Sequence, residues 1–140
     1  MLVLAGVNSE SVVYDLGCGD GRIVVAAAGA YRAKKVVGVE QNQKLCSIAL
    51  ANTARLQNAI IVRANYDTVD LSEASVVTIY QSTSENARLK QKFVKELSSG
   101  STIVSNDFGI PGWRPRHFSV FRDGRRSYRI IVYVIGSHLP

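Results

Sequence analysis

Three glycines and two carboxylates could together hold a ligand near the start of the chain. In VVYDLGCGDGRIVV, residues 12–25, the glycines Gly17, Gly19 and Gly21 follow a run of apolar residues that contains Asp15. Glycines there let a ligand approach the main chain, and the following helix turns free N–H groups toward it. The next apolar run, KVVGVE, ends at Glu40, whose carboxylate suits a ribose because it accepts hydrogen bonds from two hydroxyls.

The pattern departs from the two common phosphate-binding loops. A dinucleotide-binding loop has its third glycine three residues after the second, where this chain has Arg22. A P-loop needs a Gly-Lys-Ser/Thr sequence, which does not follow here. Asp15 and Asp20 would repel a pyrophosphate. The loop therefore fits a ligand with a ribose and a positive charge but no phosphate. The alternative is a loop that only turns the chain from a strand into a helix.

Alternating strands and helices position these residues. In the second helix, the spacing groups Leu45, Ile48, Ala49 and Asn52 on one side. Near-continuous apolar strands separated by helices predict an α/β fold with a doubly wound, mostly parallel sheet. The expected strands are Val12–Leu16, Lys35–Glu40, Ala59–Ala64, Ser75–Tyr80 and Ser101–Asn106, and the expected helices are Ile23–Ala30, Asn42–Leu56 and Glu85–Leu97.

The last part of the chain predicts an antiparallel β-hairpin at the sheet edge. HFSVFR and RRSYRIIVYVIG flank Asp123–Gly124, a dipeptide that tolerates the positive φ of a type I′ turn. Almost no helix is expected between the fifth strand and this hairpin. Ligands of open α/β sheets bind beyond the carboxyl ends of the strands. By this rule, one rim at the carboxyl ends of the strands contains Gly17–Gly21, Glu40, Asn65–Asp67, Tyr80–Gln81 and Asn106–Phe108.

The positive charge of the chain is concentrated near this hairpin. Six arginines and one aspartate give a charge of +5 between Arg114 and Arg129, out of +6 for the whole chain. Such a patch fits a nucleic acid or an acidic protein partner. The alternative is a solvated hairpin surface without a partner.

Length and composition indicate one globular domain, residues 1–140. With 46% hydrophobic and 20% charged residues, the chain has enough apolar side chains for a core. No apolar run approaches the ~20 residues that cross a membrane, and we expect no membrane contact. Cys18 and Cys46 lack metal or redox spacing, and His117 and His138 are isolated, so no metal site is expected. Without an export signal at the start, we expect reduced thiols and a cytoplasmic protein.

YDLGCGDGR followed by VVGVE resembles the first two motifs of the Rossmann-like S-adenosylmethionine-dependent methyltransferases, and the resemblance covers nearly the whole chain. The later stretches VVTIY, ENARLKQKFVKEL and IVSNDFGIPGW are similar to those of small archaeal protein-lysine methyltransferases, which have mitochondrial relatives. The resemblance implies S-adenosylmethionine as cofactor and protein lysines as substrate. Relatives usually carry a mostly helical segment before the first strand that helps to cover the cofactor. Here MLVLAGVNSE stands in that place.

The family pattern also implies roles for individual residues. Asp15 and the glycine loop would surround the methionine moiety, Glu40 the ribose, and Asn65 the adenine amino group. The alternatives are structural, with Asn65 capping a turn and Asp107 bracing its loop. The implied cofactor residues are Asp15, Gly17, Cys18, Gly19, Asp20, Gly21, Glu40, Asn65, Tyr66 and Tyr80, and the implied substrate residues are Gln81, Asn106, Asp107, Phe108 and Trp113.

Methyl transfer to lysine requires a neutral amine, because a free lysine has a pKa of about 10.4 and its ammonium has no lone pair. A nearby sulfonium and partial desolvation both lower that pKa. Asp107 would attract the ammonium first, and Tyr80 or water would accept the proton. No residue is assigned as an obligatory general base.

The sequence is also compatible with two other classes of function. A nucleic-acid methyltransferase is favoured by the arginines of the hairpin. Enzymes that methylate exocyclic base amines, however, resemble one another in an Asn/Asp-Pro-Pro-aromatic motif, where this chain has YQST. The third class is a cofactor-binding module without catalysis.

Overall fold

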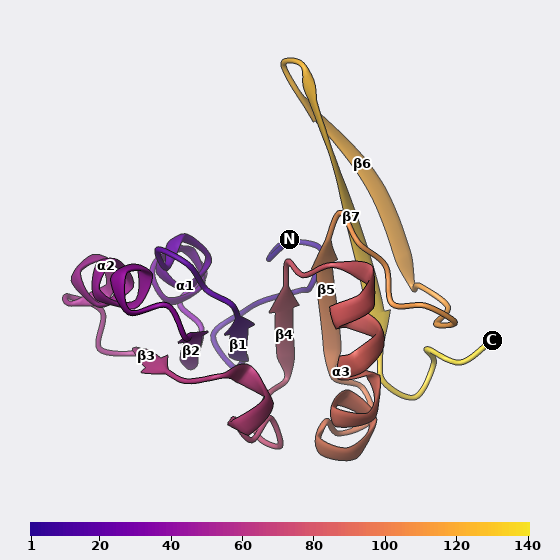
Figure 1. The fold of residues 1–140 in the computed structure, drawn as a ribbon, viewed down its shortest axis with the longest axis horizontal. Coiled ribbons are helices and arrows are strands. Elements are labelled where there is room, and N and C mark those ends of the chain that lie inside the picture. The colour runs from indigo at the N-terminus through magenta and orange to yellow at the C-terminus, as the bar shows by residue number, and fades with distance from the viewer.

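The computed structural model describes residues 1–140 and contains one seven-stranded sheet in the order β3-β2-β1-β4-β5-β7-β6 (Figure 1). The first five strands are parallel, and β7 runs antiparallel to both β5 and β6. The α/β fold class and the C-terminal hairpin are therefore confirmed. The strands are β1 (Val12–Leu16), β2 (Lys35–Glu40), β3 (Ala59–Arg63), β4 (Val76–Ile79), β5 (Thr102–Asn106), β6 (His117–Asp123) and β7 (Arg126–Val134), and the helices are α1 (Arg22–Ala28), α2 (Gln43–Thr53), the 3₁₀ turn η1 (Tyr66–Thr68) and α3 (Thr83–Glu96).

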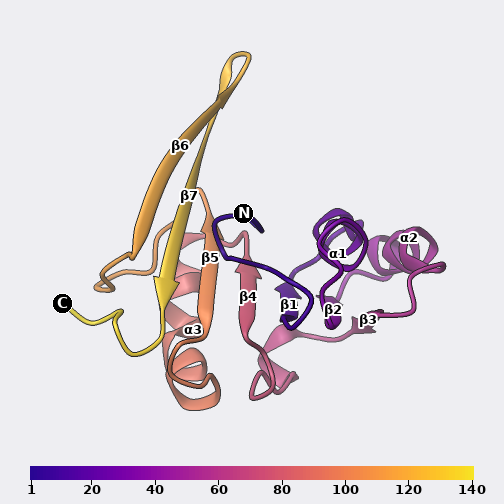
Figure 2. The ribbon, with the colours of Figure 1, turned by 180° about the vertical axis from the view of Figure 1, so that it is seen from behind.

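Helices cover both faces of the sheet. Alternate residues of β1 point to opposite faces, so Val13 packs with α1 and α2 while Tyr14 and Leu16 pack with α3. The helix α3 lies in front of the sheet in Figure 1 and behind it in Figure 2. The parallel strands are buried on both sides, which explains their near-continuous apolar sequences.

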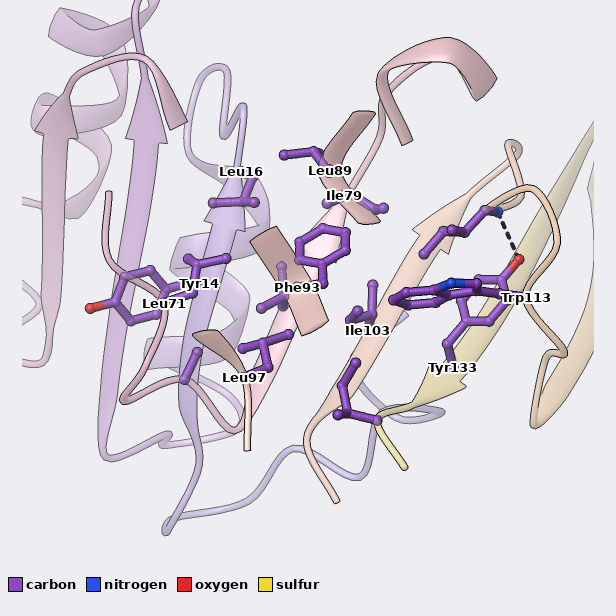
Figure 3. Close-up of a cluster of buried hydrophobic side chains, with 14 of the residues drawn as sticks. Tyr14, Leu16, Leu71, Ile79, Leu89, Phe93, Leu97, Ile103, Trp113 and Tyr133 are labelled. Atoms are coloured by element: carbon purple, nitrogen blue, oxygen red, sulfur yellow. Dashed lines mark hydrogen bonds between the residues drawn. The ribbon is translucent and has the colours of Figure 1, made fainter. Parts of the chain in front are cut away.

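The larger core cluster lies under α3. Figure 3 shows Phe93 between Leu89, Ile79 and Ile103, and the Phe93 side chain is fully buried. Further along the same layer, Tyr133 accepts a hydrogen bond from the main-chain N–H of Ile110 over 2.9 Å. This contact ties the segment after β5 to β7. No helix of the chain is long and apolar enough to cross a membrane.

The strands β1 and β2 have the predicted bounds, and the other predicted strands and helices differ from the observed ones by one to three residues at one or both ends. Ser82 accepts a hydrogen bond from the Glu85 N–H and starts α3 two residues earlier than predicted. In α2 the face against the sheet is Cys46, Ala49 and Thr53. Leu45 and Ile48, predicted to share one side of this helix with Ala49, are 37% and 44% exposed, whereas Ala49 is fully buried.

Candidate functional site

Two cavities open at the rim where the parallel strands end, and Gly17 lines both of them. The larger one, about 590 Å³, lies toward β2 and β3. The smaller one, about 440 Å³, lies toward β5 and the hairpin. The predicted site residues divide between the two. Glu40, Asn65, Tyr66 and Gln81 line the larger cavity, and Asp15, Cys18, Gly19, Asp20, Tyr80 and Asn106 line the smaller one.

Glu40 joins the glycine loop to the start of α2. Its Oε1 accepts a hydrogen bond from the Gly19 N–H over 3.0 Å, and its Oε2 accepts one from the Asn42 N–H over 2.9 Å. A carboxylate oxygen can accept two hydrogen bonds, so each keeps a free lone pair beside the larger cavity. Two acceptors on one rigid group match the paired hydroxyls of a ribose.

Each glycine of the loop has its own structural reason. A Cβ on Gly17 would lie 2.4 Å from Gln81 Nε2, and a Cβ on Gly21 would lie 3.2 Å from the Cβ of Ala49 in α2. Gly19 differs, because a Cβ there would meet no atom within 4 Å and would extend into open space. Its φ of +58° is also one that glycine adopts without strain. The loop therefore leaves bare backbone at the smaller cavity.

Asp15 places a buried carboxylate beneath this backbone. Its Oδ1 accepts a hydrogen bond from the Thr78 hydroxyl over 2.7 Å, and it has no ion-pair partner in the chain. Burial raises the pKa of Asp15 to about 6; the nearby Glu40 charge adds to the rise, and the Thr78 hydrogen bond opposes it. An ionised Asp15 therefore favours a cationic ligand group in the smaller cavity.

Cys18 is a packing residue in this loop. Burial, followed by the charges of Asp15 and Glu40, raises the pKa of the Cys18 thiol to about 12. A protonated, buried thiol is a poor nucleophile. No group of three or more His, Cys, Asp or Glu residues is placed to hold a metal ion.

The far wall of the larger cavity is a polar network between η1 and α3. Asn65 Oδ1 accepts from the Asp67 N–H over 3.0 Å, so Asn65 caps the turn and also lines the cavity. The Tyr66 hydroxyl donates to Glu85, and Arg88 bridges Glu85 and Asp67 at 2.8 and 2.6 Å. Glu85 and Arg88 were not predicted, although their three-residue spacing at the start of a helix was visible in the sequence.

The smaller cavity ends in an aromatic and polar wall. Tyr80 stacks on Phe108 with ring centroids 6.4 Å apart, and its hydroxyl oxygen accepts a hydrogen bond from Arg126 over 3.2 Å. The Arg126 guanidinium also lies 4.5 Å from the centroid of the Tyr128 ring. Asn106 Oδ1 is buried there without a hydrogen-bond partner. Burying an acceptor without a hydrogen bond costs folding free energy, and a hydrogen-bond donor of a bound ligand would offset that cost.

Three predicted substrate residues, Asp107, Phe108 and Trp113, line neither cavity, and neither does the predicted cofactor residue Gly21. Asp107 has a φ of +64° and exchanges two hydrogen bonds with the main chain of Arg129, at 2.7 and 2.9 Å. Trp113 is buried in the core between Phe93 and Tyr133, with ring centroids 6.3 and 5.9 Å away. The structure gives Asp107 a role in bracing β5 against β7 and gives Trp113 a role in packing. Their contact with substrate stays a prediction.

Comparison with known families assigns the chain that forms this rim to a family of enzymes. The family described as the ANTKMT methyltransferase domain matches residues 15–117, which contain the glycine loop, Glu40, Tyr80 and Asn106. The chain belongs to this methyltransferase family.

Relatives of this methyltransferase match 72% to 99% of the chain. A protein named Protein-lysine N-methyltransferase from Saccharolobus islandicus is 45% identical over 99% of the chain and 88% of its own length. The adenine nucleotide translocase lysine N-methyltransferase of Mus musculus is 33% identical over 72% of the chain and 45% of its own length. The crystal structure of an RNA methyltransferase from Salinibacter ruber, in complex with S-adenosyl-L-homocysteine, is 33% identical, with a TM-score of 0.90 over 99% of this chain and 90% of that one.

The cofactor of this methyltransferase is S-adenosylmethionine, and the rim fits it in three ways. The bare backbone at Gly19 leaves the room that a side chain would fill. Glu40 offers two acceptors for ribose hydroxyls beside the larger cavity. Asp15 supplies a negative charge without a partner beside the smaller one. Arg88 is the only basic residue that lines the larger cavity, and its charge is paired with the carboxylates of Asp67 and Glu85.

Sequence reasoning missed Arg126 and Tyr128 as site residues. Asn106, at the carboxyl end of β5, pairs with Ile130 of the antiparallel β7. Residues of β7 that precede Ile130 must therefore extend past the end of β5, over the rim. This offset follows from the antiparallel pairing that the hairpin predicted, so the signal was present in the sequence.

Proposed function

We propose that this chain transfers a methyl group from S-adenosylmethionine to the side-chain amine of lysine in proteins. The observation that carries the proposal is the pair of cavities that meet at Gly17. The larger one suits a nucleoside, and the smaller one continues to an aromatic wall with an unpartnered acceptor. The 45% identical relative named for protein-lysine methylation supports the substrate class.

Arg126, from the hairpin, favours a neutral amine over an ammonium on its side of the smaller cavity. When bound, S-adenosylmethionine supplies a methyl group on a positively charged sulfur, which leaves with the electron pair as the nitrogen–carbon bond forms. Arg126 lies beside the cavity and disfavours an ammonium there, so it lowers the pKa of an incoming lysine. Tyr80 and Tyr128 give this side of the cavity an aromatic lining, and Phe108 stacks on Tyr80. The proton goes to solvent.

In this proposal Asn106 orients the substrate amine. Its buried Oδ1 accepts an N–H of the neutral amine, which orients the nitrogen lone pair away from that hydrogen bond. Alignment of this kind supplies much of the acceleration in transfer reactions, on the order of several kcal/mol. We assign no general base, because the only buried carboxylate in the cavity, Asp15, lies under the loop.

The decisive experiment supplies the purified chain with methyl-tritiated S-adenosylmethionine and mixed protein and RNA from one cell extract. We expect label in protease-sensitive material that releases methyl-lysine on hydrolysis, at an initial rate about tenfold lower in the Asn106→Ala variant. Label confined to RNA, or no label at all, would contradict the proposal.

RNA methylation is the second candidate. The 33% identical Salinibacter ruber structure carries the name RNA methyltransferase, and the arginines between Arg114 and Arg129 would suit a polyanion. The same experiment separates the two candidates, because ribonuclease would then release the label.

We further propose that the arginine-rich hairpin contacts an acidic surface of the substrate, and that the chain works in the cytoplasm. Two free, buried cysteines support the second point, because they fit a reducing compartment.

A further inference from the structure

The β6–β7 hairpin rises past the carboxyl ends of β4 and β5, on the side where both cavities open (Figure 1). Only its base packs against the protein. Three large apolar side chains on β6 are half-exposed, namely Phe118, Val120 and Phe121. A hairpin that faces only solvent does not require exposed apolar side chains. Exposed apolar groups next to a site often mark a contact surface.

The two faces of the hairpin differ in what they adjoin. Directly paired residues of antiparallel strands share a face, and Phe121 pairs with Tyr128 while Asp123 pairs with Arg126. Tyr128 and Arg126 both line the smaller cavity. The face that carries Phe121 is therefore continuous with the place where the methyl group is transferred. We call it the cavity face.

Phe118 lies on the opposite face. It pairs with Ile131, which belongs to the core cluster under α3. Its exposed fraction is 53%, against 50% for Phe121. The chain thus offers two phenylalanines on one strand with nearly equal exposure and opposite orientation.

Resting on the proposed function, we propose that the cavity face receives the polypeptide that flanks the target lysine. The aromatic pair Phe121–Tyr128 suits an apolar side chain of the substrate next to that lysine. Arg126 lies on this face opposite Asp123, and Arg125 adjoins them in the turn, so the net charge there is positive and the neighbouring substrate residues that fit it are acidic.

The test compares Phe121→Ser with the matched control Phe118→Ser on two probes. One probe is a short peptide with a single lysine flanked by leucine and glutamate, and the other is N-acetyl-lysine amide. For Phe121→Ser we expect the KM for the peptide to rise about tenfold, equivalent to ~1.4 kcal/mol, with kcat unchanged. Methylation of N-acetyl-lysine amide and the Kd for S-adenosylmethionine should match those of the unmodified chain, and Phe118→Ser should leave all four quantities unchanged.

Replacing glutamate by glutamine in the peptide should raise KM in the unmodified chain, and added salt should reduce the difference. Equal effects of the two phenylalanine variants would overturn the inference while activity on N-acetyl-lysine amide upholds the proposed function. No methylation of either lysine probe would instead refute the proposed function. Label in an added RNA oligonucleotide that is lost in Phe121→Ser would show a nucleic-acid occupant and overturn a polypeptide one.

Discussion

The carboxylate of Glu40 accepts a hydrogen bond from the main-chain N–H of Gly19 across 3.0 Å. Gly19 follows β1 and Glu40 is the last residue of β2, so this bond fixes the position of the glycine loop relative to β2. One side chain therefore shapes the loop and, in the proposed cofactor site, would also present acceptors to the ribose. Changes at Glu40 are expected to affect both.

Glu40→Ala should weaken S-adenosylmethionine binding by ~1.5–3 kcal/mol, the scale of hydrogen bonds to a charged group. It should also lower the melting temperature of the free protein, because the N–H groups of Gly19 and Asn42 lose their acceptor. Titration calorimetry and thermal unfolding measure the two effects. The control is Glu10→Ala, an exposed residue before β1 at the opposite end of the sheet. Unchanged affinity in Glu40→Ala would refute the ribose assignment.

Gly19→Ala tests the bare backbone of the loop, and Gly100→Ala is its matched control. Both glycines have positive φ, +58° and +90°, and at neither would a Cβ meet an atom within 4 Å. Each substitution should therefore cost about 1–2 kcal/mol of folding free energy through backbone strain alone. Only Gly19→Ala should weaken cofactor binding. Its Kd for S-adenosylmethionine should rise tenfold or more, which corresponds to a loss of about 1.4 kcal/mol or more of binding free energy. Equal cofactor affinities in the two variants would show that Gly19 does not contact the cofactor.

Asp15 should make the stability of the free protein depend on pH. Its pKa rises from an ordinary 3.8 to about 6 in the folded chain, mainly through burial. The folded state therefore holds the proton more tightly, and this stabilisation is complete below about pH 3.8 and lost as the pH rises through 6. Asp15→Asn should remove that slope and make the free protein more stable by ~2–3 kcal/mol above pH 6. Urea unfolding at several pH values measures it.

The same substitution should act in the opposite direction on cofactor binding. Affinity of the unmodified chain should rise between pH 5 and about 7 as Asp15 ionises and attracts the cationic ligand, and this rise should vanish in Asp15→Asn. A variant that keeps the unmodified pH profile of binding would rule out Asp15 as the source of the charge.

Asn106→Ala should separate activity from stability. The Asn106 side chain makes no hydrogen bond within the chain, so its removal should not lower the free energy of unfolding. If Oδ1 positions the amine, kcat for lysine methylation should fall about tenfold, while the Kd for S-adenosylmethionine stays within twofold. Single-turnover kinetics with N-acetyl-lysine amide measure the loss. A higher cofactor Kd with unchanged kcat would place Asn106 in cofactor binding instead.

The sequence was sufficient for the sheet and for the rim that it forms. Apolar strands, glycine spacing and the Asp-Gly turn are local signals, and parallel topology brings their ends together. Glu40 was predictable because it is the last residue of a strand whose neighbour carries the loop. Which residues of α2 face the sheet was harder to predict: small residues fit between α2 and the sheet, so Ala49 is buried, whereas Leu45 on the same predicted side lines the smaller cavity.

Contacts between residues distant in the sequence were harder to predict. Nothing local indicates that Asp107 bonds to the main chain of Arg129 or that Trp113 packs on Tyr133. Both follow from how the segment after β5 folds back without a helix. Asn106 was predicted as a site residue, but only packing reveals that its oxygen has no partner.

The division of the rim at Gly17 has a consequence for inhibition. Because one residue separates two chambers, a nucleoside fragment and an amino-acid fragment should occupy them at the same time without competing. Joining such fragments raises the effective concentration of each at its own chamber, commonly to the millimolar range or above. Bisubstrate compounds that extend past Tyr80 would also contact the hairpin. Their selectivity would then come from these hairpin contacts rather than from contacts with the nucleoside.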